Sequence, residues 1–131
     1  MDIPRKLRDA MVAHAIEDDP NECCGLLSGR DGTLTGHHRM RNAEQSPYRY
    51  SMDGKELLMT LREIEDGGAE LQVIYHSHTH SPAYPSATDV RLATWPEASY
   101  VLVSLEKRDA PDVRSYRIVD GEVTEETVVI V

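Results

Sequence analysis

The chain has 131 residues, 40% of them hydrophobic, and this length suits one domain with a buried core, so we expect residues 1–131 to form a single domain. The formal net charge is −9, from 23 acidic and 14 basic residues. This charge argues against proteins that bind nucleic acid or anionic membranes through Lys and Arg. The sequence shows no signal peptide and no apolar stretch long enough to span a bilayer, which predicts a cytoplasmic location.

Three segments carry helical patterns. Apolar residues recur every four positions over 3–18, and an Asp-Pro sequence follows, where a helix cannot continue. A second apolar stripe covers 53–66 and is followed by two glycines, a common helix end. A short third helix is predicted to start at Ser86 and to stop before Trp95.

Strands are predicted where runs rich in apolar and β-branched residues lie between turn residues. These runs are 22–29, 33–40, 71–78, 100–105, 113–119 and 123–131, with one more short strand over 48–52. Two Asp-Gly pairs, at 31–32 and 120–121, are hairpin turn signals. Strands that alternate with helices indicate an α/β or α+β fold, in which helices pack against one sheet.

Three of the six histidines lie within five residues, as His76, His78 and His80. Because positions i and i+2 of a strand share a face, His76 and His78 present two imidazoles side by side, which suits a tetrahedral zinc ion. A catalytic zinc needs a third protein ligand, either His80 or a carboxylate further along the chain. We favour Asp89, because His80 lies in a predicted loop that does not fix its direction.

A zinc-dependent hydrolase also needs a general base, and Glu22, an isolated carboxylate that opens an apolar strand, is the candidate. Purely structural interpretations compete with each role. The two histidines can be ordinary sheet residues, and Glu22 can be a solvated charge at a strand edge. Ser86 and Asp89 also fit a helix capping box, and this interpretation competes for the Asp89 carboxylate.

Taken together, these residues resemble the motif of the JAMM (MPN-plus) metallopeptidase family, which is a distant Glu, then His-x-His, then Ser-x-x-Asp. Glu22, the pair His76 and His78, and Ser86 with Asp89 match that motif in order. The match is specific because four side-chain types agree in sequence, and the resemblance extends over nearly the whole chain.

The resemblance implies a JAMM/MPN-like domain with a mixed, mostly antiparallel, curved sheet flanked by helices, similar to cytidine deaminases. It implies one zinc ion per chain, held by His76, His78 and Asp89. It also implies that Glu22 is the catalytic acid and base, and that Ser86 donates a hydrogen bond to the oxyanion, a contribution of about 100-fold or more in rate.

A closer similarity, in residues 74–79, 84–86, 100–104 and 114–121, is to the bacterial branch of the family. That branch includes peptidases of small ubiquitin-like sulfur-carrier proteins, which cut after the Gly-Gly terminus of the carrier and release cysteine. His80 is a departure from the expected pattern. The chain is too short for the large insertions with which eukaryotic deubiquitinating members grip ubiquitin chains.

Two other functions remain open from the sequence. Relatives that lack the metal ligands serve as protein-binding scaffolds, although this chain keeps every ligand. A hydrolase of free peptides or small amides is the other alternative. Cys23 and Cys24 are expected to be packing residues without a mutual disulfide, because neighbours on a strand point to opposite faces.

Overall fold

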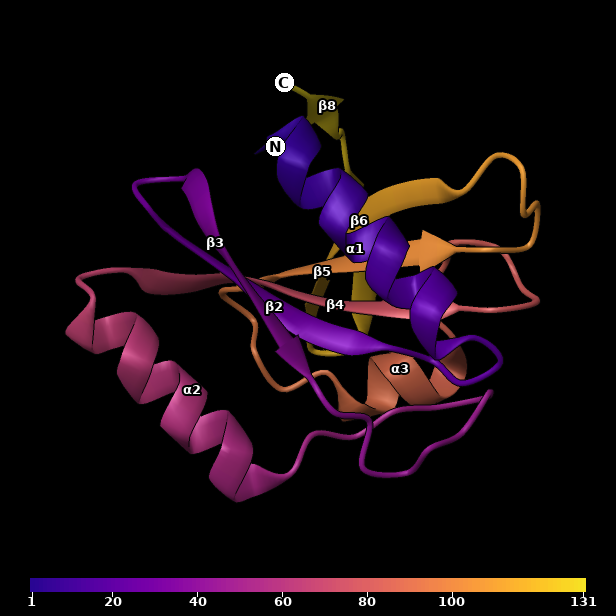
Figure 1. Cartoon of the computed structure of the whole chain (residues 1–131), viewed down its shortest axis with the longest axis horizontal. Coiled ribbons are helices and arrows are strands. Elements are labelled where there is room, and N and C mark those ends of the chain that lie inside the picture. The colour runs from indigo at the N-terminus through magenta and orange to yellow at the C-terminus, as the bar shows by residue number, and fades with distance from the viewer.

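A six-stranded sheet lies at the centre of the computed structural model, which describes residues 1–131 (Figure 1). The strand order is β3-β2-β4-β5-β6-β7. The strands are β2 (Cys24–Arg30), β3 (Thr33–Met40), β4 (Glu70–His78), β5 (Ser99–Ser104), β6 (Asp112–Val119) and β7 (Glu122–Glu126). All neighbours are antiparallel except β4 and β5, so the sheet is mixed and mostly antiparallel, as predicted. The β4–β5 crossover contains the short helix α3 (Ala87–Leu92).

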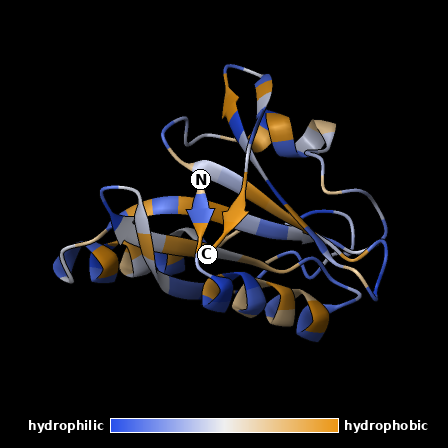
Figure 2. Ribbon diagram, turned by 90° about the horizontal axis from the view of Figure 1, so that it is seen from above, coloured by the Kyte–Doolittle hydropathy of each residue, from blue (hydrophilic) through white to orange (hydrophobic).

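Two hydrophobic cores lie on opposite faces of this sheet, because side chains alternate along each strand. Val73 and Tyr75 of β4 pack with helix α1 (Arg5–Asp18), whereas Ile74 packs with helix α2 (Gly54–Asp66). Figure 2 shows hydrophobic and hydrophilic residues alternating along the helices, as expected for helices with one apolar side. The alternation places the side chains of His76 and His78 on the same face as that of Ile74.

The turns and helix ends agree with the predictions. Asp31 and Gly32 both have positive φ, as do Asp120 and Gly121, which is the backbone of the two-residue hairpin turn that Asp-Gly favours. Helix α1 ends at Asp18 and helix α2 ends at a glycine cap. None of the three helices is both long and apolar enough to cross a membrane.

The two ends of the chain differ from the predictions. The predicted helix over 3–18 begins two residues later, because Ile3 belongs to strand β1 (Asp2–Ile3). The single strand predicted over 123–131 is two strands, β7 and β8 (Val129–Ile130), and β8 pairs in parallel with β1. Backbone pairing between residues over 120 positions apart leaves no local pattern, so the sequence did not indicate it.

The predicted strand over 48–52 is absent. The buried Asn42 side chain instead binds this segment: its amide nitrogen donates to the Arg49 carbonyl at 3.0 Å, and its amide oxygen accepts from the Ser51 backbone N–H at 3.3 Å. These backbone groups bind a side chain where a strand would bind a neighbouring strand. Tyr50, between them, points into the molecule, and its position matters for the site described next.

Candidate metal centre and active site

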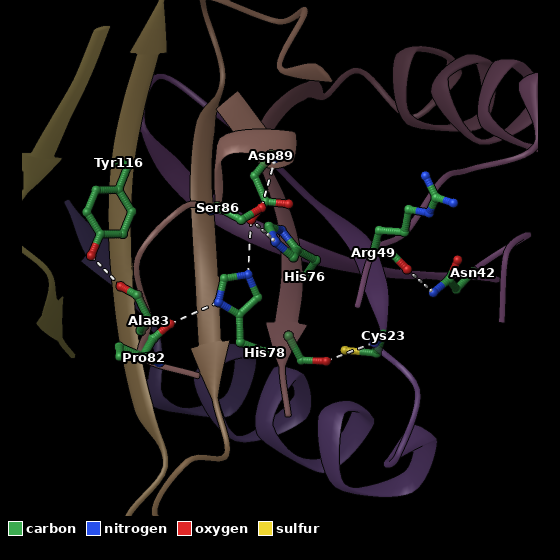
Figure 3. Close-up of polar contacts among 11 residues, drawn as sticks. Cys23, Asn42, Arg49, His76, His78, Pro82, Ala83, Ser86, Asp89 and Tyr116 are labelled. Carbon is green, nitrogen blue, oxygen red and sulfur yellow. Dashed lines mark hydrogen bonds and ion pairs between the residues drawn. The ribbon is translucent and has the colours of Figure 1, made fainter. Parts of the chain in front are cut away.

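Three predicted ligands converge at the end of β4. Nε2 of His76 lies 3.1 Å and Nε2 of His78 lies 3.0 Å from Oδ2 of Asp89 (Figure 3). One ligand atom from each residue falls within 4.8 Å of the others, and all three side chains are buried. Strand β4 supplies both histidines, and the first turn of α3 folds back to supply the carboxylate.

The donor atoms fit a bound cation. Nδ1 of His78 lies 2.9 Å from the carbonyl oxygen of Pro82, and a carbonyl oxygen only accepts, so Nδ1 carries a proton. In the neutral ring Nε2 then presents a lone pair to the carboxylate oxygen of Asp89. Two electron-rich atoms 3.0 Å apart need a positive charge between them, which a proton or a metal ion supplies. Two imidazole nitrogens and one carboxylate oxygen form a donor set used by catalytic zinc sites, in which a fourth position stays open.

Asp89 caps its helix with the same oxygen that faces the histidines. Oδ2 accepts a hydrogen bond from the backbone N–H of Ser86 at 2.9 Å, and the Asp89 N–H donates to Oγ of Ser86 at 3.0 Å. The predicted capping box is therefore present. One orientation of the Asp89 carboxylate places Oδ2 near the Ser86 N–H and near both histidine nitrogens, and the cap holds it in place.

The pKa shifts favour the metal-binding form at His76 and Asp89, and the protonated form at His78. Burial lowers the pKa of His76 and outweighs the opposing hydrogen bond to Asp89. Burial also lowers the pKa of His78, but hydrogen bonds to Asp89 and Pro82 raise it further, so the net shift is upward. Burial raises the pKa of Asp89, but hydrogen bonds from both histidines lower it well below its ordinary range. At neutral pH Asp89 is thus ionised and His76 is neutral, as metal ligation requires.

Glu22 lies on the same face of the sheet as the histidines. Cys24 pairs with His76 across the β2–β4 ladder, and the Ser77 N–H donates to the Cys23 carbonyl at 3.1 Å, which extends the ladder one residue beyond β2. Because side chains alternate along extended backbone, Glu22 points to the same side as Cys24 and His76.

The Glu22 carboxylate is buried and incompletely paired. The residue is 3% exposed, and Oε1 has no hydrogen-bond partner. Its main chain is fixed, since its N–H donates to the Ser46 carbonyl at 2.9 Å and its carbonyl accepts from Nδ2 of Asn42 at 3.0 Å. Burial raises the pKa of Glu22 to about 8, with a smaller lowering by His78 and a smaller raising by Asp89. A carboxyl group with this pKa can take up and release a proton near neutral pH.

Ser86 is exposed at the start of α3, beside the cluster. Its Oγ already accepts from the Asp89 N–H, so its hydroxyl proton remains available to a third group. The predicted oxyanion donor therefore has a free proton on the ligand side of the helix.

A cavity of about 300 Å³ adjoins the cluster, and nine of its 14 lining residues are hydrophobic. Asp89 and Tyr50 line it together with Leu92 and Trp95 of the crossover. The Tyr50 ring stacks on the His76 imidazole, with centroids 4.4 Å apart and planes inclined by 28°. The sequence did not single out Tyr50, because nothing local distinguishes it from Tyr48, which is 84% exposed.

The remaining candidates lie outside the cluster. His80, the alternative third ligand, is exposed, and its Nδ1 contacts only the neighbouring Thr79 hydroxyl at 3.0 Å. Cys23 and Cys24 are buried free thiols, and burial raises the pKa of each to about 12. Protonated thiols packed in a core are inert, in agreement with the predicted packing role.

Known proteins resemble this chain along nearly its whole length. A family model described as prokaryotic homologs of the JAB domain matches residues 4–119. The CysO-cysteine peptidase of Mycobacterium tuberculosis is 53% identical over 127 residues, which are 95% of this chain and 87% of that protein. A solved structure of a protein from Desulfitobacterium hafniense is 37% identical, with a TM-score of 0.89 over 99% of this chain and 92% of that one. A JAB1/MPN domain protein from Archaeoglobus fulgidus, 22% identical, shares the fold with a TM-score of 0.65 over 98% and 99% of the two chains.

Proposed function

Because the chain belongs to the family of prokaryotic homologs of the JAB domain, we propose that it is a zinc-dependent peptidase of a small ubiquitin-like sulfur-carrier protein. It hydrolyses the amide bond after the Gly-Gly terminus of the carrier and releases cysteine. The observation that carries this proposal is the convergence of His76, His78 and Asp89 on the sheet face that also bears the buried Glu22. The 53% identity to a CysO-cysteine peptidase supports the substrate class, and we expect the reaction in the cytoplasm.

His76, His78 and Asp89 would hold the zinc ion. When bound there, zinc supplies Lewis-acid chemistry, because it polarises a carbonyl group and lowers the pKa of water to about 7. Glu22 takes the proton from the attacking water and delivers it to the leaving amine. The Ser86 hydroxyl donates a hydrogen bond to the carbonyl oxygen as negative charge develops on it. The products are the carrier, with a free terminal carboxylate, and free cysteine, whose amino group has taken up the proton.

The site lies at the end of β4, which pairs with β2 and β5, so a substrate tail cannot add to β4 as a further strand. An extended tail can instead bind beyond the strand end through backbone hydrogen bonds, which order it before attack. Two glycines at the scissile end let the backbone approach the buried ligands closely, because they carry no side chain that would collide with Ser86 or Tyr50.

The first test is the metal content of purified protein by elemental analysis. We expect about one zinc per chain in the wild type and in His80→Ala, and a loss of zinc in Asp89→Ala, in line with three-ligand coordination. The His80 variant is the matched control, because it removes a nearby exposed imidazole outside the cluster. Zinc retained by Asp89→Ala, or absent from reconstituted wild type, would contradict the proposed site.

The second test separates metal binding from proton transfer. Glu22→Gln keeps the size and burial of the side chain but cannot accept the proton, so we expect full zinc content and a loss of turnover of about 100-fold or more. Release of cysteine from a carrier–cysteine conjugate, followed by mass spectrometry, measures turnover. Hydrolysis by Glu22→Gln at the wild-type rate would refute the acid–base role. A wild-type protein that binds the conjugate and zinc without cutting would indicate a scaffold.

A further inference from the structure

The two histidines of the cluster are held in different ways. Nδ1 of His78 donates to the Pro82 carbonyl, and this hydrogen bond fixes the rotation of its ring. Nδ1 of His76 is buried and has no hydrogen-bond partner at all. Metal-binding histidines are ordinarily oriented by a hydrogen bond from the second ring nitrogen, so His76 lacks the usual support.

Tyr50 instead packs against the face of the His76 ring. Its ring covers the His76 imidazole in a stacked arrangement, 4.4 Å between centroids. Tyr50 also lines the mostly apolar cavity of about 300 Å³. Without the Tyr50 ring, the face of the His76 imidazole would lose this contact, and the ring could turn away from Asp89.

The backbone on both sides of Tyr50 is fastened to one buried side chain. Asn42 binds the Arg49 carbonyl (Figure 3) and the Ser51 N–H. Its Nδ2 also donates to the Glu22 carbonyl at 3.0 Å. The same amide therefore connects the proposed general base with the segment that carries Tyr50. An irregular segment held this firmly can set the position of an aromatic ring as well as a strand can.

We infer that Tyr50 is a positioning residue of the metal centre, which holds the His76 ring toward Asp89 by aromatic stacking in place of a hydrogen bond. This inference rests on the proposed function insofar as His76 is a zinc ligand. It assigns the work to the ring of Tyr50 and gives no part to its hydroxyl group, which makes no hydrogen bond to another residue.

The test is zinc affinity of the folded protein, measured by competition with a chromophoric chelator. Tyr50→Leu keeps an apolar side chain but removes the ring, and we expect zinc binding to weaken about 10-fold or more, as when a histidine loses its orienting partner. Tyr50→Phe keeps the ring, and we expect its zinc affinity to stay within a factor of about two of the wild type. At saturating zinc, the kcat of Tyr50→Leu should return toward the wild-type value, although its affinity for zinc stays weaker.

Trp95→Leu is the matched control, because it removes another aromatic ring from the same cavity without touching His76. Its zinc affinity should equal that of the wild type. Equal affinity in Tyr50→Leu and wild type would overturn the inference, and so would an equal loss in Tyr50→Phe or in Trp95→Leu. If the wild type itself bound no zinc, the proposed function would fail instead.

A measurement on the wild type covers the case in which Tyr50→Leu does not fold. In metal-free protein, NMR should show nuclear Overhauser contacts between the rings of Tyr50 and His76, and ring-current shifts of the His76 ring protons. Free rotation of the His76 ring, without these contacts, would contradict the positioning role.

Discussion

Glu22 is buried at a cost to the fold. Its carboxyl group is 3% exposed, one oxygen has no partner, and burial raises its pKa to about 8 from an ordinary 4.5. Because the pKa of Glu22 is raised only in the folded protein, the unfolded chain releases this proton at a lower pH than the folded protein does. The contribution of Glu22 to the free energy of unfolding is therefore fully present below pH 4.5 and is lost between pH 4.5 and about 8. A carboxylate with a lowered pKa shows the opposite dependence.

Metal-free Glu22→Gln should therefore be more stable than the metal-free wild type, and the difference should grow with pH. Glutamine does not ionise, so the variant escapes a loss of at most about 1.4 kcal/mol for each pH unit in this window. Urea unfolding with chelator, at half-unit steps from pH 5 to 8.5, measures the difference. A difference that is flat with pH would show that Glu22 is ionised throughout in the folded protein.

For single residues, the sequence indicated which residue types form the site, but it did not indicate where each side chain points. His76, His78 and Asp89 were identified as a set, and the structure brings them together. Asp89 was preferred to His80 because the predicted loop does not fix the direction of the His80 side chain. In the structure His80 is exposed. Tyr50 was missed because its inward direction comes from the Asn42 side chain, eight residues away, which follows no periodic pattern.

At the scale of elements, α3 is the least secure part of the site. It has six residues, and apart from the Asp89 side chain none is buried. It is held by its capping box, by the contacts of Asp89 with β4 and by the packing of Val90 against the core. A helix this short is marginal by itself. Zinc ligation would join α3 to β4 through Asp89, whereas β5 is already buried along its whole length.

We expect zinc to slow hydrogen exchange in residues 87–92 by about 10-fold or more, because binding penalises the local opening of α3. Exchange in β5 should change little. Mass spectrometry of peptides from wild type and Asp89→Ala, with and without zinc, measures both. Protection of α3 by zinc in Asp89→Ala as well would mean that another residue ties the helix down.

Elements with a strong local pattern were predicted well, and those held by distant contacts were not. The last six residues of β4 are all buried, and the predicted strands 33–40 and 113–119 lie within one residue of β3 and β6. The strand predicted over 48–52 failed because a side chain takes its hydrogen bonds. The last predicted strand is divided because its end pairs with β1.

At the scale of the whole molecule, the sheet separates the candidate site from a second polar cluster under α1. The Tyr75 hydroxyl lies 2.6 Å from Nδ1 of His14 on α1 and 2.7 Å from Nε2 of His37 on β3. Tyr75 precedes His76 in β4, so the two side chains leave opposite faces. Its ring leaves no room at Gly25 of β2, where a Cβ would lie 2.4 Å from it. The cluster thus joins α1, β3 and β4 on the face away from the ligands.

Tyr75→Phe should therefore lower stability without changing the metal centre. It deletes a buried hydroxyl and leaves two imidazole nitrogens without that partner, which costs about 1–3 kcal/mol in the free energy of unfolding. Zinc affinity should stay within a factor of about two, because no ligand on the opposite face loses a contact. Chemical denaturation and chelator competition on the same preparations separate the two quantities. A tenfold loss of zinc affinity would instead show that the α1 face sets the position of β4, and that the two sides of the sheet act as one unit.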